Sequence, residues 1–273
     1  MRKFLWSIGL LHLISFLGAQ ELFVVTDPAS NMPAGSINIR ISQSLFKELL
    51  EEGFNYHIMP ELSYGINKNL MLRAGSFVSN RSNQLYAEGG SLFLKYRFFS
   101  SDDIHSHFRM AAYARVSKNR ADIHQEQIET MGHNSGAELG FIATKLVHKT
   151  AISSSVSLEK ATNNRPDYDF PETQDNTAIN YSLSWGRLMY PTTYKSYKQT
   201  NINLMFEFLG QTLSKNQKTF IDGTAALQFI IHSQSRIDLA YRKSLFSNMI
   251  RSAPNGIYLN VEYTFFKPGK PQK

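Results

Sequence analysis

The sequence predicts an all-β protein whose antiparallel strands close into a transmembrane β-barrel of about twelve strands. Three observations support this fold class. Apolar and polar residues alternate with period two along most of the chain, short and long connections alternate, and aromatic residues gather at the ends of the alternating segments. With 273 residues, the chain is long enough for one large all-β domain.

The clearest segment spans residues 256–266, near the end of the chain. In an extended conformation one face is continuous and apolar, and the other is polar. The apolar face carries Ile257, Leu259, Val261, Tyr263 and Phe265, and the polar face carries Asn260, Glu262 and Thr264. A strand that crosses a bilayer and stops at the headgroups is expected to have this pattern, with aromatic residues at its end.

Eleven earlier segments repeat the alternation, from residues 37–42 to residues 237–242. Their polar faces carry charged side chains, which we expect to line the interior of the barrel. As a lining, these charges would govern which ions and polar solutes enter. Both signs occur in similar number, so strong ion selectivity is not expected. The candidate lining residues are Arg40, Glu61, Arg73, Lys95, Arg97, Arg109, Arg115, Glu138, Glu207, Asp238, Arg242 and Glu262.

The connections support the same architecture. Residues 67–69, 100–106, 147–150 and 232–235 form short links, whereas links after odd-numbered segments are generally longer and more polar, notably residues 118–132 and 162–176. Short turns at one rim and longer loops at the other are typical of such barrels. An even number of strands places both chain ends on the side of the short turns.

The N-terminus has the features of a secretory signal. Two basic residues precede an apolar run, and small residues follow it near Ala19, so residues 1–19 are expected to be removed. The apolar run is about 14 residues, short of the ~20 that a spanning helix needs. Residues 20–34 contain two prolines and are expected to form a periplasmic lead-in to a barrel of residues 35–266. Within it, residues 22–25 either add a short strand or enter the barrel mouth.

Charge and cysteine content exclude several other classes of function. The net charge is +7, but five basic residues lie in the signal and in residues 267–273, which leaves +2 for the rest. A nucleic-acid partner is therefore not expected. The chain has no cysteine, so thiolate metal sites and disulfides are excluded. No pattern predicts a bound cofactor.

These residues resemble those of a bacterial outer-membrane β-barrel protein, and the resemblance extends over residues 35–266. Its most specific part is the last strand, because such proteins end in an alternating apolar sorting signal that usually finishes on an aromatic residue. Here Phe265 and Phe266 are followed by the basic residues 267–273, expected to be a short periplasmic tail. The resemblance implies a location in the cell outer membrane, with membrane lipid as partner. It implies no particular oligomeric state.

For function, the sequence favours a pore or transporter-like barrel for small polar solutes, without chemistry of its own. Two alternatives stay open. One is an outer-membrane lipid hydrolase that uses His133 and Ser135, since a suitably oriented histidine can activate a hydroxyl. The other is a structural or secretion-associated barrel that transports nothing.

Three further segments carry weaker expectations. Residues 44–52 have apolar residues at helical spacing, which predicts a short amphipathic helix over the first loop. Residues 165–175 form an acidic, proline-broken outer loop for which solvation is the default interpretation. His105 and His107 flank a turn residue, but two imidazoles alone do not predict a metal site.

Overall fold

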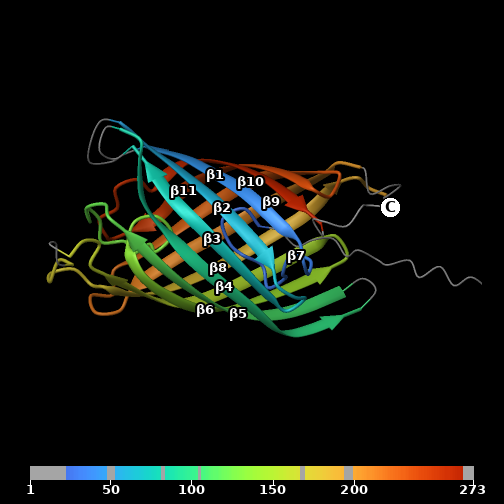
Figure 1. Cartoon of the computed structure of the whole chain (residues 1–273), viewed down its shortest axis with the longest axis horizontal. Coiled ribbons are helices and arrows are strands. Elements are labelled where there is room, and N and C mark those ends of the chain that lie inside the picture. The colour runs from blue at the N-terminus through green and yellow to red at the C-terminus, as the bar shows by residue number, and fades with distance from the viewer. Residues whose placement is uncertain are drawn as a thin grey trace, which may run out of the picture.

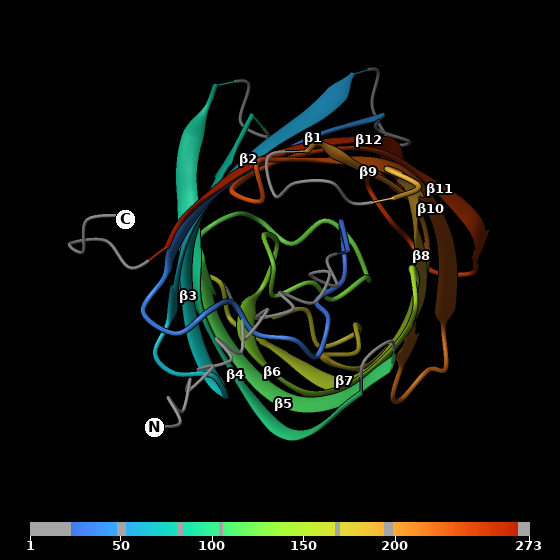
Figure 2. The same cartoon turned by 90° about the vertical axis from the view of Figure 1, so that its right-hand side faces the viewer.

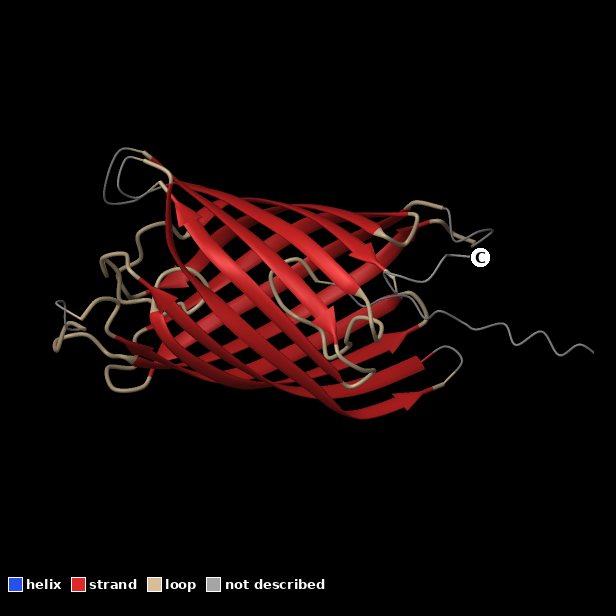
Figure 3. Ribbon diagram, in the orientation of Figure 1, coloured by secondary structure: helices blue, strands red, loops and turns tan. Residues whose placement is uncertain are grey.

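The computed structural model describes residues 23–47, 53–80, 84–103, 106–166, 170–193 and 199–266. Twelve antiparallel strands close into one barrel in which each strand pairs with its neighbours in the sequence and β12 pairs with β1 (Figures 1 and 3). The predicted fold class and strand number are confirmed. None of the described residues forms a helix long and apolar enough to span a membrane.

The strands are ten to seventeen residues long, as tilted membrane-spanning strands require. In chain order they are β1 (Ile37–Lys47), β2 (Phe54–Gly65), β3 (Leu70–Ser79), β4 (Tyr86–Asp102), β5 (Ser106–Asn119), β6 (Ser135–Val147), β7 (Thr150–Thr162), β8 (Thr177–Tyr190), β9 (Asn201–Leu213), β10 (Thr219–Ile231), β11 (Ser235–Ser247) and β12 (Asn255–Phe265).

Alternation along each strand places apolar side chains on the outer surface. In β12, Ile257 and Val261 are exposed, while Asn260 between them is 2% exposed in the interior. An exposed apolar surface of this extent is stable only against lipid. Aromatic side chains lie at the rim where β1 begins and β12 ends, as the interfacial girdle predicts. They are Tyr64, Tyr96, Phe98, Phe99, Tyr190, Tyr263 and Phe265.

The pairing of the first and last strands closes the barrel. Ile37 at the start of β1 lies opposite Phe265 at the end of β12, and the register continues without a shift to Lys47 and Asn255. The two ends of the barrel sequence therefore meet at the rim with the short turns. Closure leaves no open sheet edge, so the strand backbone satisfies its own hydrogen bonds within the membrane.

The predicted helix at residues 44–52 is wrong for the part that is described. Ser44 to Lys47 continue β1 and pair with both β12 and β2. Two open backbone edges offered a full ladder of hydrogen bonds, which outweighs a weak helical pattern. The signal at residues 1–19, the tail at residues 267–273 and residues 48–52 lie outside the described residues.

Two irregular segments lie inside the barrel (Figure 2). Residues 23–35, here called the lumen segment, enter from the rim where β1 begins. Residues 120–134, here called the inner loop, connect β5 to β6 and fold inward from the opposite rim. Residues 23–25 lie inside the barrel, which agrees with one of the two expectations for residues 22–25, and the other described residues of the expected periplasmic lead-in share this placement. The physical reason for this placement is a set of buried hydrogen-bonding groups on the barrel wall.

Candidate functional site

All twelve charged residues predicted to line the lumen lie on the inner face or at its rim. Five of them are buried: Lys95, Glu138, Glu207, Asp238 and Arg242. The others are partly buried: Arg40, Glu61, Arg73, Arg97, Arg109, Arg115 and Glu262. Their effect on solute selectivity stays a prediction. Many of these groups hold internal segments of the chain in place.

Glu207 of β9 is the main anchor of the lumen segment. One carboxylate oxygen accepts the backbone N–H of Val24 at 2.8 Å, and the other accepts that of Thr26 at 2.8 Å. Val25 N–H donates to both oxygens at longer distances. Hydrogen bonds to an ionised group are stronger than neutral ones, particularly where water is excluded. Glu207 thus fixes three successive residues at the centre of the lumen.

Arg73 of β3 holds the same segment from the opposite wall. Its guanidinium binds Asp27 through two nitrogens, at 2.8 and 3.2 Å, and lies 3.8 Å from Glu61. The paired geometry matches the fork of an arginine to a carboxylate. Lys95 on β4 is 1% exposed and donates to the carbonyl oxygens of Pro28 and Ser30 at 2.7 and 2.8 Å. These contacts link both walls of the barrel through the lumen segment.

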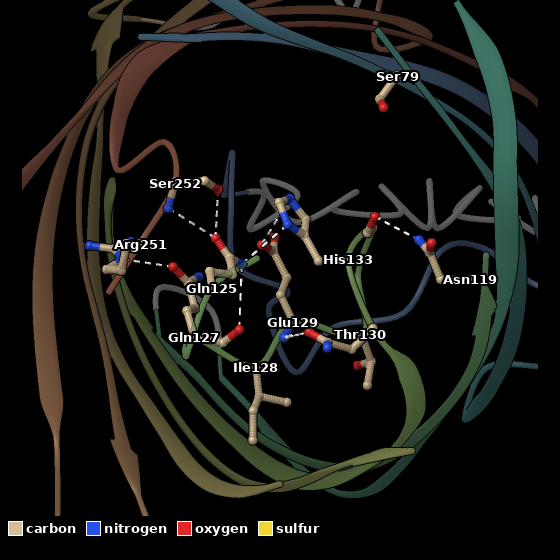
Figure 4. Close-up of polar contacts among 12 residues, drawn as sticks. Ser79, Asn119, Gln125, Gln127, Ile128, Glu129, Thr130, His133, Arg251 and Ser252 are labelled. Atoms are coloured by element: carbon tan, nitrogen blue, oxygen red, sulfur yellow. Dashed lines mark hydrogen bonds and ion pairs between the residues drawn. The ribbon is translucent and has the colours of Figure 1, made fainter. Parts of the chain in front are cut away.

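The inner loop is held by a second set of wall residues. Gln211 of β9 accepts the N–H of Ile128 at 2.9 Å and donates to its carbonyl at 2.7 Å. Glu159 of β7 accepts the N–H of Thr130 at 2.6 Å. The side chain of Ile128 is buried in an apolar cluster with Ala161, Ala178, Leu213, Phe220 and Met249. Figure 4 shows this loop crossing the lumen.

A buried ion cluster connects the inner loop to the last outer loop. Asp222 is fully buried and accepts from Arg242 at 2.7 Å and from Arg251 at 2.6 and 2.7 Å. Arg251 also donates to Gln127 of the inner loop at 2.6 Å (Figure 4). Its guanidinium lies 3.8 Å from the ring centroid of Phe220, a cation–π contact. One carboxylate thereby positions two arginines and, through Arg251, the inner loop.

The ionisation of Glu126 should make the stability of the docked inner loop depend on pH. Burial opposes ionisation of its carboxylate, but hydrogen bonds from Lys218 and from Ile250 N–H outweigh that cost and hold the pKa of Glu126 below its usual value. The docked loop therefore gains stability from Glu126 above the ordinary carboxyl pKa, and loses it as pH falls through the lowered pKa. Hydrogen exchange at the inner loop should quicken over that acidic range.

The variant Glu126→Gln is the control for this pH dependence. It should remove the part of the acid response that comes from Glu126, and its loop should exchange faster than that of the parent chain at neutral pH. An acid response equal to that of the parent would contradict the assignment to Glu126.

His133 and Ser135, the candidate catalytic pair, have other partners in the structure. Ser135 is 1% exposed, and its hydroxyl accepts from Asn119 N–H and donates to Asn119 C=O. His133 binds Gln125 through Nδ1 at 3.1 Å and lies 3.6 Å from Glu129 through Nε2. Its ring stacks on His57, with centroids 5.2 Å apart. Both residues thus brace the inner loop, inside the lumen rather than at the lipid surface where a lipid hydrolase would act.

The acidic outer loop and the histidine pair are only partly described. Asp175 accepts the backbone N–H groups of Thr177 and Lys215, so it caps a turn between strands. His107 lies 2.9 Å from Asp102 at the rim, while His105 lies outside the described residues. Among the described residues, no group of three or more potential metal ligands of the histidine, cysteine and acidic types is present.

The lumen is divided into cavities by the two internal segments. Thr26 and Asp27 line a cavity on the side of β1 to β4, together with Arg40, Arg73 and Lys95. Val25 and Thr26 also line a cavity on the other side, where Gln127 and Ile128 of the inner loop form part of the boundary. The lumen segment is therefore suspended across the barrel with space on both sides.

Sequence reasoning missed several residues of this site. Asp222 is not among the predicted lining residues, although Phe220, Asp222 and Thr224 alternate with exposed residues on the inward face of β10. Gln211 lies on the inward face of β9 beyond the residues that were counted. Arg251 and Asp27 lie in irregular segments, where periodicity carries no signal.

Comparisons with known proteins identify the fold. No family model matches the chain, and no curated protein matches its sequence. Solved structures do match. The outer membrane channel "COG4313" from Pseudomonas putida F1 is 10% identical with a TM-score of 0.55, covering 88% of this chain and 98% of that one. The NanC porin is 8% identical with a TM-score of 0.51, and the KdgM porin is 10% identical with a TM-score of 0.50. Each match covers 85% of this chain and 99% of the porin.

Together with the lipid-facing exterior, these matches confirm the predicted architecture and the location in the cell outer membrane. The chain is an outer-membrane β-barrel with the fold of porin-like channels.

Proposed function

We propose that the chain is a gated outer-membrane pore for small polar solutes, closed in the structure described here by the lumen segment and the inner loop. The observation that carries this proposal is that two irregular segments, rather than packed wall side chains, close the lumen. A barrel sealed permanently would be expected to fill its interior with packed wall side chains, as barrels of eight strands do. Here twelve strands leave room that two irregular, polar segments occupy, with cavities beside them.

The charged wall residues have a double role under this proposal. In the closed state they bind the internal segments, as Arg73 binds Asp27 and Lys95 binds two backbone carbonyls. When a segment moves away, the same groups face the water-filled path and become available to polar solutes. A carboxylate or guanidinium left in a wet lumen keeps its hydration, which limits the cost of opening.

Arg73→Ala tests this function through the electrical current of the refolded protein in planar bilayers. Loss of the Arg73–Asp27 pair should raise the open probability, because one anchor of the lumen segment is lost while the barrel wall is kept. The ion preference should also shift, since a cation leaves the lining. Arg109→Ala should act in the same direction but more weakly, because Arg109 contacts the lumen segment through Ser30 and otherwise pairs with exposed Asp102.

Arg165→Ala is the matched control. Arg165 pairs with Asp122 near the exposed start of the inner loop, and both side chains are more than a third exposed, so the pair contributes little. Its currents should equal those of the parent protein. Currents that are absent in the parent and all three variants would contradict a pore and favour a structural barrel.

A further inference from the structure

The barrel wall recognises the lumen segment mainly by its main chain. Backbone N–H and C=O groups of residues 24–30 bond to wall side chains, and the segment has no regular secondary structure. Arg40 and Asn260 donate to the carbonyl of Val24, at 2.8 and 3.3 Å. Thr144 accepts the N–H of Ala29 at 2.9 Å. Together with the contacts of Glu207 and Lys95, wall side chains bind both N–H and C=O groups along a backbone that bends at residues 24–26 and 29.

Glu207 is the group that depends most on this arrangement. It is 1% exposed, and it forms no ion pair with any described residue. Its carboxylate instead accepts the three successive amide N–H groups of residues 24–26. A buried carboxylate without a cation must receive hydrogen bonds, because leaving it unsatisfied is costly. The wall therefore provides a preformed acceptor for successive peptide amides.

The same wall also provides a socket for an aromatic side chain. Phe23 is 2% exposed and packs in an apolar cluster with Met205, Ala226 and Ala240. Gly186 lies beside the Phe23 ring: a Cβ atom at this position would be 3.5 Å from the ring, in ordinary van der Waals contact. This apolar patch receives the side chain of Phe23, whereas the backbone that follows is bound by the polar groups of Glu207 and Lys95. At the other end of the site, Arg73 binds a carboxylate.

We propose that the lumen contains a binding site for oligopeptides in a bent, irregular conformation, which the chain's own residues 23–30 occupy when the barrel is closed. The preferred ligand carries an apolar or aromatic residue first, two or three residues with free backbone N–H groups next, and a carboxylate that reaches Arg73. This inference rests on the proposed pore function, and names short peptides as a class of solute that displaces the lumen segment. Recognition through the main chain makes the site tolerant of side-chain identity at the central positions.

Calorimetric titration of a purified variant that lacks residues 23–33 tests the site. The probe is the free peptide Phe-Val-Val-Thr-Asp-Pro-Ala-Ser, which copies residues 23–30. We expect the variant to bind this peptide with one site per barrel. The full-length chain should bind it at least roughly tenfold more weakly, because its own segment competes at a high effective concentration. A barrel that resists unfolding in SDS unless heated shows that the variant is folded.

Two changes test whether the peptide is bound through its main chain rather than through its side chains. In the first, a peptide N-methylated at the residues that copy Val24, Val25 and Thr26 keeps every side chain but loses the donors to Glu207. In the second, Glu207→Gln in the deletion variant removes the charge of the acceptor. Each should weaken binding by roughly tenfold or more, as expected for charge-assisted hydrogen bonds. Asp175→Asn in the deletion variant changes a buried carboxylate that accepts the backbone N–H groups of Thr177 and Lys215 away from the lumen segment, so this control should bind the peptide as the deletion variant does.

Each outcome decides between the two proposals. No binding by the folded deletion variant overturns the peptide site, as does unchanged binding of the N-methylated peptide. If the deletion variant conducts ions but binds no peptide, the pore function stands and this inference fails. If it binds the peptide but conducts nothing, the site stands and the pore function fails.

Discussion

Deletion of residues 23–33 is expected to turn a mostly closed barrel into a conducting one. The deletion removes every contact between the lumen segment and Glu207, Arg73 and Lys95, and joins the two cavities that the segment separates. Each lost charge-assisted hydrogen bond is worth on the order of 1.5 kcal/mol, which is about tenfold in an equilibrium between closed and open states. The time-averaged current in planar bilayers should therefore rise by roughly tenfold or more.

The inner loop limits the size of this effect. The inner loop closes the opposite half of the lumen and should still restrict current in the deletion variant. A variant that combines the deletion with Ile128→Gly, which loosens the loop, should therefore carry more current than the deletion variant alone. Ile128 loses its apolar contacts on truncation and gains backbone freedom. A deletion variant that remains folded and carries no more current than the parent would contradict the role of the lumen segment as the main closure.

Asp222→Ala is expected to have the largest effect on stability. The fully buried carboxylate accepts from Arg242 and Arg251, which are 8% and 5% exposed. Removing it leaves two buried guanidinium groups without their shared partner, and breaking a buried ion pair in this way typically costs about 3–5 kcal/mol. Arg251 should then release Gln127, so the inner loop should also exchange its amide hydrogens faster.

Asp122→Ala is the matched control for that substitution. Asp122, near the start of the inner loop, also pairs with an arginine, Arg165, but both side chains are more than a third exposed, so its loss should change the free energy of unfolding little. The measurement is unfolding in urea of protein refolded into lipid vesicles. Equal stabilities of the two variants would show that the Asp222 cluster is not a structural anchor.

The sequence was sufficient for the barrel because one simple rule applies to every strand. Lipid outside and polar groups inside force a period of two, so residues such as Leu259 and Asn260 report their faces directly. The same rule placed Arg73, Lys95 and Glu207 on the inner wall. The rule could not predict the partners of these wall residues, because Asp27 and the backbone of residues 24–30 belong to an irregular segment with no periodicity.

The inner loop shows the same limit of prediction from local sequence pattern. Its length and polarity were read as those of an outer loop, and residues such as Gln125 and Gln127 carry no signal that they fold inward. Their inward position depends on Gln211, Glu159 and Arg251, which come from distant parts of the chain. Thus local pattern predicted the walls, while long-range hydrogen bonding determined what the walls enclose.

The most direct test of gating by the lumen segment uses a reversible covalent link. The hydroxyl groups of Thr26 and Ser184 lie 2.8 Å apart, one on the lumen segment and the other on β8, so cysteines at both positions are expected to reach disulfide geometry. The parent chain has no cysteine, so no other disulfide can form. Ser155 and Ser182, whose hydroxyls are 2.6 Å apart on neighbouring strands of the wall, provide a control pair.

Single-channel current is then recorded for both double-cysteine proteins, Thr26→Cys/Ser184→Cys and Ser155→Cys/Ser182→Cys, before and after addition of a reductant. The first protein is expected to be silent when oxidised and to show openings at the parent's frequency when reduced, while the second should show the same openings in both states. Openings of equal frequency in the oxidised and reduced forms of the first protein, with the disulfide verified by mass, would contradict the claim that the lumen segment must move for the pore to open.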